Sequence, residues 1–306
     1  MSNATTACGS IWRHRRRCAK TFKAIPQLGS PPLPKDGTAF KPSTTQMTDA
    51  SYEITFCVGA PRSGTTLVNS LMCEGDSAFP ALPECTYITS IIRLFHDIVE
   101  YSDRPRFDAF AKSKETLAHT FSPSIEGLLK IARNNFQHLK AAQLVLKDPE
   151  LTLYLDVLPT FFDQFKTVCV VRDPRYVVAS LGKALSKQNR HLSLEELIAV
   201  TYNYYWRASE SNLAKSGKIH FVRYEKIVGK DENEFRALER YLGYTVGRSG
   251  FGKLFFKFDL SDATHSDNYG KPIIQSNESA PTLTEEQSLR VQQAFVGYNN
   301  IYNWWE

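Results

Sequence analysis

An apolar run, a glycine loop and a helical stretch follow one another between Tyr52 and Leu71, and this order restricts the fold more than any other feature of the chain. Tyr52 to Val58 is apolar and β-branched, which is typical of a buried strand. Gly59 to Gly64 reads as a tight turn, and Thr65 to Leu71 has helical spacing. Because free backbone N–H groups and the helix dipole both point at such a loop, the sequence predicts an anion site there.

The spacing of this loop is that of a phosphate-binding loop with one residue changed. A nucleotide triphosphatase carries lysine where this chain has Thr65, and the only cation of the loop is Arg62. The missing lysine argues against hydrolysis of ATP or GTP, since that lysine neutralises the outer phosphates beside magnesium. An arginine can still clamp an oxyanion. The alternative is a glycine turn that only joins strand to helix.

A second anchor lies more than a hundred residues later. Thr167 to Val171 reads as a short strand of a parallel, doubly covered sheet. Arg172 follows the strand, Asp173 can cap the next helix, and Pro174 suits its first turn. Ser180 lies eight residues after Arg172, about two helical turns away. Together this arginine and serine could hold a second phosphate.

The segments PRSGTT and VVRDPRYVVAS resemble those of the sulfotransferases that use 3′-phosphoadenosine 5′-phosphosulfate (PAPS), and the resemblance extends over about residues 52–298. It implies that Arg172 and Ser180 hold the 3′-phosphate of PAPS. It also implies that the product is adenosine 3′,5′-bisphosphate. The residues that the resemblance assigns to the 5′-phosphosulfate are Arg62, Ser63, Gly64, Thr65 and Thr66.

Two further residues are candidates for the chemistry. The strand at Gln143 to Leu146 ends at Lys147, and ligands of α/β sheets bind where such strands end. Glu84 and the Lys-Asp-Pro element resemble the protein-tyrosine sulfotransferase type, which implies Glu84 as general base and Lys147 as the group that stabilises charge on the sulfonate. Pro149 stands where cytosolic sulfotransferases have a catalytic histidine, so the base must come from elsewhere, which favours Glu84 as the general base. The alternatives are a helix-start glutamate and a surface lysine.

Two weaker resemblances complete the site. Tyr224 in FVRYEKIV matches a family tyrosine that lies against the adenine, and Lys271 beside Gly270 matches a basic segment that closes over PAPS. For Lys271 a solvated loop is an equal alternative.

Short apolar strands alternate with longer helical patterns, so we expect an α/β fold with a mostly parallel sheet flanked by helices. The resemblance refines this to the P-loop nucleotide-hydrolase-like fold of sulfotransferases. We expect helices at 124–139, 149–165 and 193–215, and a final helix that starts with a capping box at Thr284 and Gln287.

Residues 1–49 differ in composition from the rest of the chain. They contain a run of arginines and almost no acidic residue, so we predict a flexible basic extension followed by one sulfotransferase domain at 50–306. An organelle transit peptide is the alternative. No apolar segment follows the arginines, which disfavours a secretory signal and favours a cytoplasmic protein.

Composition excludes several other classes. A nucleotide with several phosphates explains the net charge of +5 as well as nucleic acid would, but the sequence has no basic stripe interleaved with aromatics, so we expect no nucleic-acid partner. No apolar run is long enough to span a bilayer. The six cysteines lack CxxC spacing, so we expect free thiols and no metal. The sequence leaves open whether the protein forms a homodimer.

The sequence therefore predicts transfer of a sulfonate from PAPS to a hydroxyl or amine of an acceptor, with a small molecule favoured over a glycan or protein. One rival is a P-loop kinase or nucleotide hydrolase. The other is a protein that binds PAPS without catalysing transfer.

Overall fold

The computed structural model describes residues 52–136, 139–250 and 282–306. The predicted basic extension at 1–49 and the predicted PAPS-closing residue Lys271 lie outside these ranges. Within them, the two anchor motifs fall on one compact unit that begins at Tyr52.

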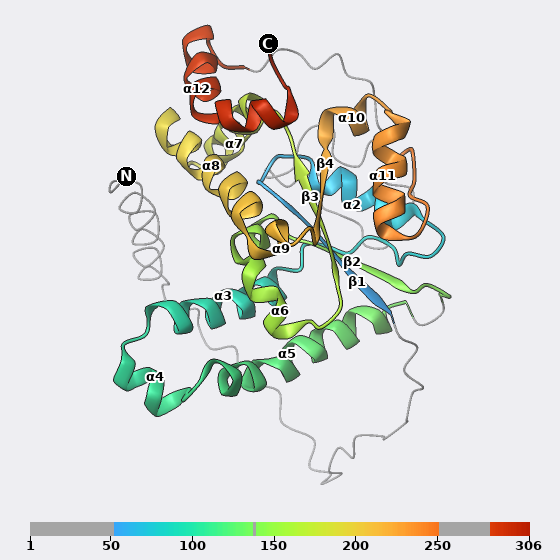
Figure 1. Ribbon diagram of the computed structural model, residues 1–306, viewed down its shortest axis with the longest axis vertical. Coiled ribbons are helices and arrows are strands. Elements are labelled where there is room, and N and C mark those ends of the chain that lie inside the picture. Colours follow the sequence, from blue (N-terminus) through green and yellow to red (C-terminus); the bar gives the residue numbers. More distant parts are fainter. Residues whose placement is uncertain (1–51, 137–138, 251–281) are drawn as a thin grey trace, which may run out of the picture. The chain divides into compact units, whose positions relative to one another are not determined.

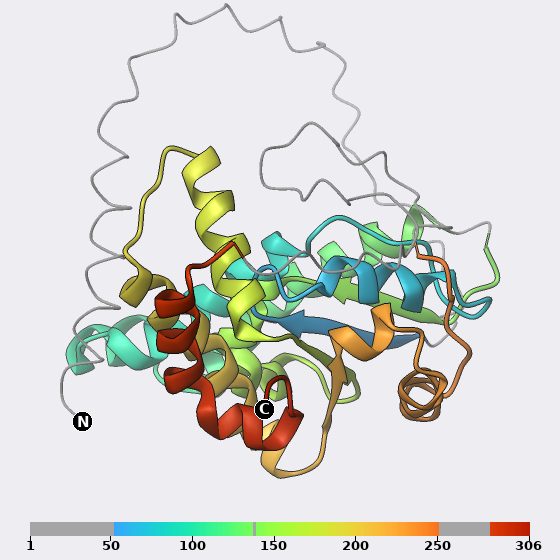
Figure 2. The ribbon, with the colours of Figure 1, turned by 90° about the horizontal axis from the view of Figure 1, so that it is seen from above.

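A four-stranded parallel sheet forms the centre of the fold, with the strands in the order β2-β1-β3-β4. Figures 1 and 2 show this twisted sheet with helices on both sides. The chain runs from β1 to β2 on one side and from β3 to β4 on the other, so the crossovers diverge at the carboxyl ends of β1 and β3. Ligands of open α/β sheets bind at such a divergence. The strands are β1 (Glu53–Gly59), β2 (Gln143–Lys147), β3 (Lys166–Val171) and β4 (Ile219–Arg223).

One face of the sheet packs against α2 (Thr65–Glu74), α10 (Tyr224–Val228) and α11 (Glu232–Leu242). Cys57 of β1 points to this face, as do several valines of the other strands. Successive residues of a strand point to opposite faces. Phe56 accordingly points to the other side, where it lies fully buried.

The opposite face carries α3 (Thr86–Tyr101), α5 (Lys114–Asn134), the 3-10 helix η1 (Pro149–Val157) and α8 (Leu194–Glu210). These elements contribute isoleucines and leucines to the largest buried cluster. Apolar residues therefore cover both faces of the sheet, as its near-continuous apolar strands require. Three short helices complete this side, α4 (Arg104–Phe110), α6 (Leu158–Phe161) and α9 (Asn212–Lys215).

Two helices close the end of the sheet where β1 and β3 finish. They are α7 (Pro174–Lys187) and α12 (Glu285–Tyr302), which pack with α8 and with Ala60 of the glycine loop. Figure 1 shows α7, α8 and α12 grouped together. The C-terminal helix is thus part of the wall behind the glycine loop.

Several local predictions are confirmed. The side chain of Asp173 accepts a hydrogen bond from the backbone of Arg175 at the start of α7. The capping box of Thr284 and Gln287 starts α12. In the described ranges all four cysteines, Cys57, Cys73, Cys85 and Cys169, are free.

Three helix predictions need correction. The helix expected at 193–215 is divided at the extended residue Ser211 into α8 and α9. The crossover helix expected at 149–165 is instead η1, with non-helical angles at Tyr154, followed by the four-residue α6. The helix expected from residue 124 begins ten residues earlier, at Lys114, and continues through Pro123. Proline usually marks a helix start because it cannot donate a backbone hydrogen bond. Here the Ser113 cap and the buried Leu117 and Ala118 stabilise the earlier turns.

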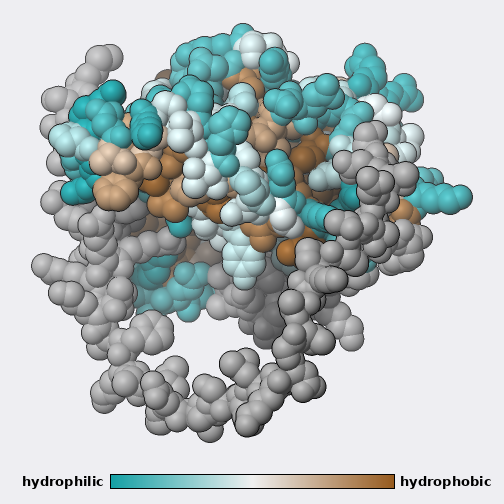
Figure 3. Space-filling view, turned by 90° about the horizontal axis from the view of Figure 1, so that it is seen from below, coloured by the Kyte–Doolittle hydropathy of each residue, from teal (hydrophilic) through white to brown (hydrophobic). Residues whose placement is uncertain are grey.

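The outer surface is mixed in character. On the side seen in Figure 3, hydrophilic residues cover much of the described surface and hydrophobic residues show between them. No helix within the three described ranges is long and apolar enough to cross a membrane.

Candidate functional site

Two glycines allow the backbone of the loop after β1 to approach its neighbours closely. At Gly59, with φ of 141°, an added Cβ would lie 2.5 Å from the backbone oxygen of Val170. At Gly64, with φ of 99°, it would lie 2.2 Å from the ring of Tyr224. Any larger residue would therefore displace β3 or the tyrosine ring, so the loop geometry requires glycine at both ends.

Between these glycines, Arg62 adopts a left-handed backbone conformation with φ of 75°. Such a conformation costs a non-glycine residue about 1–3 kcal/mol and persists only where the surroundings determine it. Two contacts hold Arg62 in place. Its Nε donates to Oγ of Ser180 (3.0 Å), and Nη1 of Arg172 donates to its backbone oxygen (3.3 Å).

The start of α2 offers unused hydrogen-bonding capacity. No side chain caps this helix, and its first turn contains no acidic residue. The first backbone hydrogen bond from the loop into the helix is made by Val68 N–H. Ser63, just before the helix, is fully buried and its hydroxyl has no hydrogen-bond partner. Buried polar groups are normally paired, so this hydroxyl and the helix start are suited to an oxyanion.

Tyr224, the first residue of α10, lies between the two motifs. Its ring packs against Gly64, and the guanidinium carbon of Arg172 lies 4.3 Å from the centre of the ring. We call Arg62, Ser63, Gly64, Arg172, Ser180 and Tyr224 the loop cluster.

A second group of side chains adjoins the start of α2. Lys147 ends β2 and donates from Nζ to Oε1 of Glu84 (2.7 Å) and to Oγ1 of Thr66 (3.2 Å). The lysine side chain is 6% exposed and that of Glu84 is 48% exposed, so the ammonium is buried while the carboxylate faces solvent. We call Thr66, Glu84 and Lys147 the lysine cluster.

A backbone contact explains how Glu84 reaches Lys147 across 63 residues of chain. The N–H of Cys85 donates to the backbone oxygen of Lys147 (3.0 Å), which joins the segment before α3 to the end of β2. No side chain caps α3, whose N-cap residue is Cys85. Glu84 therefore does not serve as the cap of α3, and its carboxylate is directed to the lysine.

The residues that follow Lys147 begin η1 and contact α3. Asp148 is 3% exposed, and its Oδ1 accepts from the backbone of Glu150 (2.9 Å) to cap η1. Burial is the main cause that raises the pKa of the Asp148 carboxyl, and the charges of Glu84 and Glu150 raise it further. Glu150 pairs with Arg93 of α3 at 2.6 Å.

Apart from Lys271, which lies outside the described residues, the predicted site residues fall in the two clusters, with Thr65 in the chain between them. Arg62 and Ser180, which the resemblance assigns to different ends of the donor, are in direct contact. Sequence reasoning missed Thr152, whose hydroxyl binds the backbone of Gly59. A polar residue among the leucines of PELTLYLD was an available signal, because buried polar groups bind something. It also missed the bond from Asp173 N–H to Oε1 of Glu225 (2.7 Å).

The parallel sheet with its glycine loop at the divergence of β1 and β3 defines the class of this protein, an α/β protein of P-loop-like fold. A sequence model of the Sulfotransferase family matches residues 55–247, more than half of the chain. The chain belongs to this family. It is therefore a transferase enzyme that moves a sulfonate group, and members of the family generally take that group from PAPS.

Solved structures with a similar fold include several sulfotransferases. The sulfotransferase domain of the Synechococcus PCC 7002 olefin synthase is 16% identical, with 81% of this chain and 96% of that chain covered and a TM-score of 0.48. Sulfotransferase STF9 from Mycobacterium avium is 13% identical, with 82% and 76% covered and a TM-score of 0.44. Comparison with curated proteins gave no match.

Proposed function

We propose that this sulfotransferase takes its sulfonate from PAPS and releases adenosine 3′,5′-bisphosphate. The observation that supports this proposal is the contact between the two motifs, in which Arg62 binds Ser180 and Arg172 binds the backbone of Arg62. A donor with anionic groups at both its 5′ and 3′ positions needs two anion-binding sites side by side. A nucleoside triphosphate carries its phosphates in a single chain and does not need the second site.

The residues at the start of α2 fit the 5′-phosphosulfate. The buried, unpartnered hydroxyl of Ser63 and the uncapped helix start supply donors, and Arg62 supplies positive charge. Thr65, 4% exposed, and Thr66 add hydroxyls beside them. These groups would orient the reacting end of the donor and stabilise charge on its oxygens.

Arg172 and Ser180 are the residues we assign to the 3′-phosphate. Arg172 already lies over the ring of Tyr224 at 4.3 Å, an arrangement that holds the guanidinium by cation–π attraction. We assign Tyr224 to the adenine, which would stack on the same ring. Lys271, the further candidate for this part of the donor, lies outside the described residues.

The lysine cluster supplies the chemistry of transfer. Glu84 accepts the proton of the acceptor hydroxyl or amine, and the freed electron pair forms the new bond to sulfur. The bond between sulfur and the bridging oxygen breaks, and its electrons leave with the bisphosphate. Lys147, aided by Arg62, stabilises the negative charge on the sulfonate and bridging oxygens. The exposed carboxylate of Glu84 leaves an acceptor room to reach it.

A screen of acceptors with PAPS, read as the mass gain of one sulfonate, tests this function. We expect at least one hydroxyl or amine acceptor to gain the group. Replacing Lys147 with methionine should abolish the gain, since methionine keeps the apolar stem and removes the charge. Lys166→Met is the matched control, because Lys166 pairs with Glu53 (2.8 Å) at the other end of the sheet. Equal activity in the two variants would contradict the assignment of Lys147.

A further inference from the structure

Thr152 of η1 makes an unusual pair of hydrogen bonds to one residue. Its hydroxyl accepts from the backbone N–H of Gly59 (2.8 Å) and donates to the backbone oxygen of the same residue (3.1 Å). Thr152 is fully buried, and 93 residues of chain separate the two partners.

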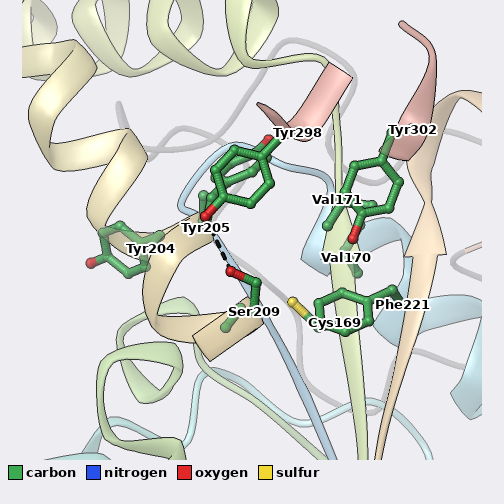
Figure 4. A pocket seen from close by; sticks show the side chains of 11 residues that line it. Cys169, Val170, Val171, Tyr204, Tyr205, Ser209, Phe221, Tyr298 and Tyr302 are labelled. Atoms are coloured by element: carbon green, nitrogen blue, oxygen red, sulfur yellow. Dashed lines mark hydrogen bonds between the residues drawn. The ribbon is translucent and has the colours of Figure 1, made fainter. Parts of the chain in front are cut away.

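Tyr205 of α8 repeats this arrangement at the next strand. Its hydroxyl donates to the backbone oxygen of Arg172 and accepts from the backbone N–H of Arg172 (3.4 Å). Tyr205 is 5% exposed, within an aromatic group that Figure 4 shows around a small cavity. In that group the hydroxyl of Tyr298 bonds instead to the hydroxyl of Ser209 (3.1 Å).

The sheet explains why a hydroxyl is needed at each place. The pairing of β1 with β2 ends at Cys57 and Lys147, two residues before Gly59, and the pairing of β3 with β4 ends at Val171, one residue before Arg172. Beyond these points Gly59 still pairs with Val170 of β3 but has no partner in β2, and Arg172 has none in β4. Gly59 is buried and Arg172 is partly buried, so leaving these backbone groups unpaired would be costly. A hydroxyl both donates and accepts, so one side chain can satisfy both groups and fix the peptide orientation.

We propose that Thr152 and Tyr205 are positioning residues for the donor, Thr152 through the loop that holds the 5′ end and Tyr205 through the arginine that holds the 3′-phosphate. This inference rests on the proposed use of PAPS. Neither side chain touches the donor. Thr152 instead fixes the backbone at Gly59, where the loop begins, and Tyr205 fixes the backbone of Arg172 itself.

Binding of two nucleotides by the full-length protein separates the two roles. The probes are adenosine 3′,5′-bisphosphate and adenosine 5′-monophosphate, which lacks the 3′-phosphate, and calorimetry gives both affinities. Tyr205→Phe should reduce the preference for the bisphosphate by about tenfold, because it loosens only the 3′ grip. Thr152→Val should weaken both ligands by a similar factor of about ten and leave the preference unchanged.

Matched variants exclude a general loss of stability. Thr152→Ser keeps the hydroxyl and should restore both affinities, while Tyr298→Phe removes a hydroxyl from the same aromatic group and should leave the preference intact. At Tyr205, a merely structural role would lower the melting temperature without changing the preference. At Thr152, it would lower the melting temperature without changing either affinity. Should Tyr205→Phe fail to fold, the valine and serine variants of Thr152 still test the 5′ half.

The outcomes distinguish a failure of the positioning roles from a failure of the proposed use of PAPS. Wild-type protein that shows no preference for the bisphosphate would overturn the use of PAPS and this inference with it. If Tyr205→Phe kept the wild-type preference for the bisphosphate, the positioning role of Tyr205 alone would be overturned. If Thr152→Ser bound both nucleotides no more tightly than Thr152→Val, the positioning role of Thr152 alone would be overturned.

Discussion

The loop cluster and the lysine cluster adjoin each other, yet their supports differ. In the loop cluster, Arg62 and Arg172 contact each other, and buried hydroxyls hold the backbones of Gly59 and Arg172. In the lysine cluster, Glu84 lies outside any helix, is 48% exposed and is held by its bond to Lys147. The side that we propose binds the nucleotide is thus held by buried groups. The carboxylate that we propose as the base is exposed enough to leave Lys147 and take a proton from an acceptor.

Changing Glu84 should give the largest effect on turnover. Glu84→Gln keeps an acceptor for the Lys147 hydrogen bond but cannot take a proton. We expect turnover at saturating PAPS to fall about 10²–10⁴-fold, the usual contribution of a general base, with bisphosphate affinity unchanged. Steady-state kinetics and calorimetry give the two numbers.

Glu150→Gln is the control for that variant, since Glu150 is also a partly exposed glutamate in an ion pair, here with Arg93. It should leave turnover near the wild-type value. Near-normal turnover in Glu84→Gln would mean that the base lies elsewhere and that the contrast between the clusters has no catalytic meaning.

Changing Arg172 should have the opposite profile. Arg172→Ala removes a charge-assisted contact to a phosphate that does not react. Such a contact typically contributes about 1.5–3 kcal/mol, so the affinity for the bisphosphate should fall about ten- to a hundredfold. Turnover at saturating PAPS should change little.

The control is Arg248→Ala. The guanidinium of Arg248 also lies over an aromatic ring, 4.2 Å from the centre of the ring of Phe235. Phe235 is on α11, away from the loop cluster. Loss of turnover at saturating PAPS in Arg172→Ala, with affinity intact, would reverse the proposed division between binding and chemistry.

The buried Asp148 should produce the smallest effect, and that effect depends on pH. Burial raises the pKa of its carboxyl in the folded protein, so the unfolded chain ionises first as the pH rises. The folded state therefore loses stability from the unfolded pKa up to the raised one. Asp148→Asn cannot ionise, so its melting temperature should match wild type in acid and exceed it at pH 7.

Thermal unfolding between pH 3 and pH 7 measures this difference. An asparagine variant that is less stable by a constant amount at every pH would show that Asp148 acts only as the cap of η1.

The sequence predicted those parts of the site that depend on local pattern. The loop at Gly59, the strand-end positions of Lys147 and Arg172 and the cap at Asp173 each follow from neighbouring residues. The supports could not be predicted in this way. Thr152 lies in a segment that reads as a regular helix, and Tyr205 reads as an ordinary core residue of α8. Their roles depend on where β1 and β3 end in space, which is a property of the assembled sheet.

The same limit applies to the direct contact of Arg62 with Ser180. The two residues are 118 positions apart. The resemblance to PAPS-dependent sulfotransferases assigns Arg62 to the 5′-phosphosulfate and Ser180 to the 3′-phosphate. Only the adjacency of β1 and β3 in the sheet shows that the residues assigned to the two ends of the donor form one cluster.

The most direct test of the account is the binding of two ligands to the wild-type protein by calorimetry, adenosine 3′,5′-bisphosphate and ATP with magnesium. We propose that the loop cluster binds two separate phosphates side by side, and Thr65, next to this cluster, stands where a triphosphatase has lysine. We therefore predict that the bisphosphate binds and that ATP with magnesium binds at least about tenfold more weakly, a difference of about 1.4 kcal/mol. Tight binding of ATP with magnesium, and none of the bisphosphate, would contradict the account.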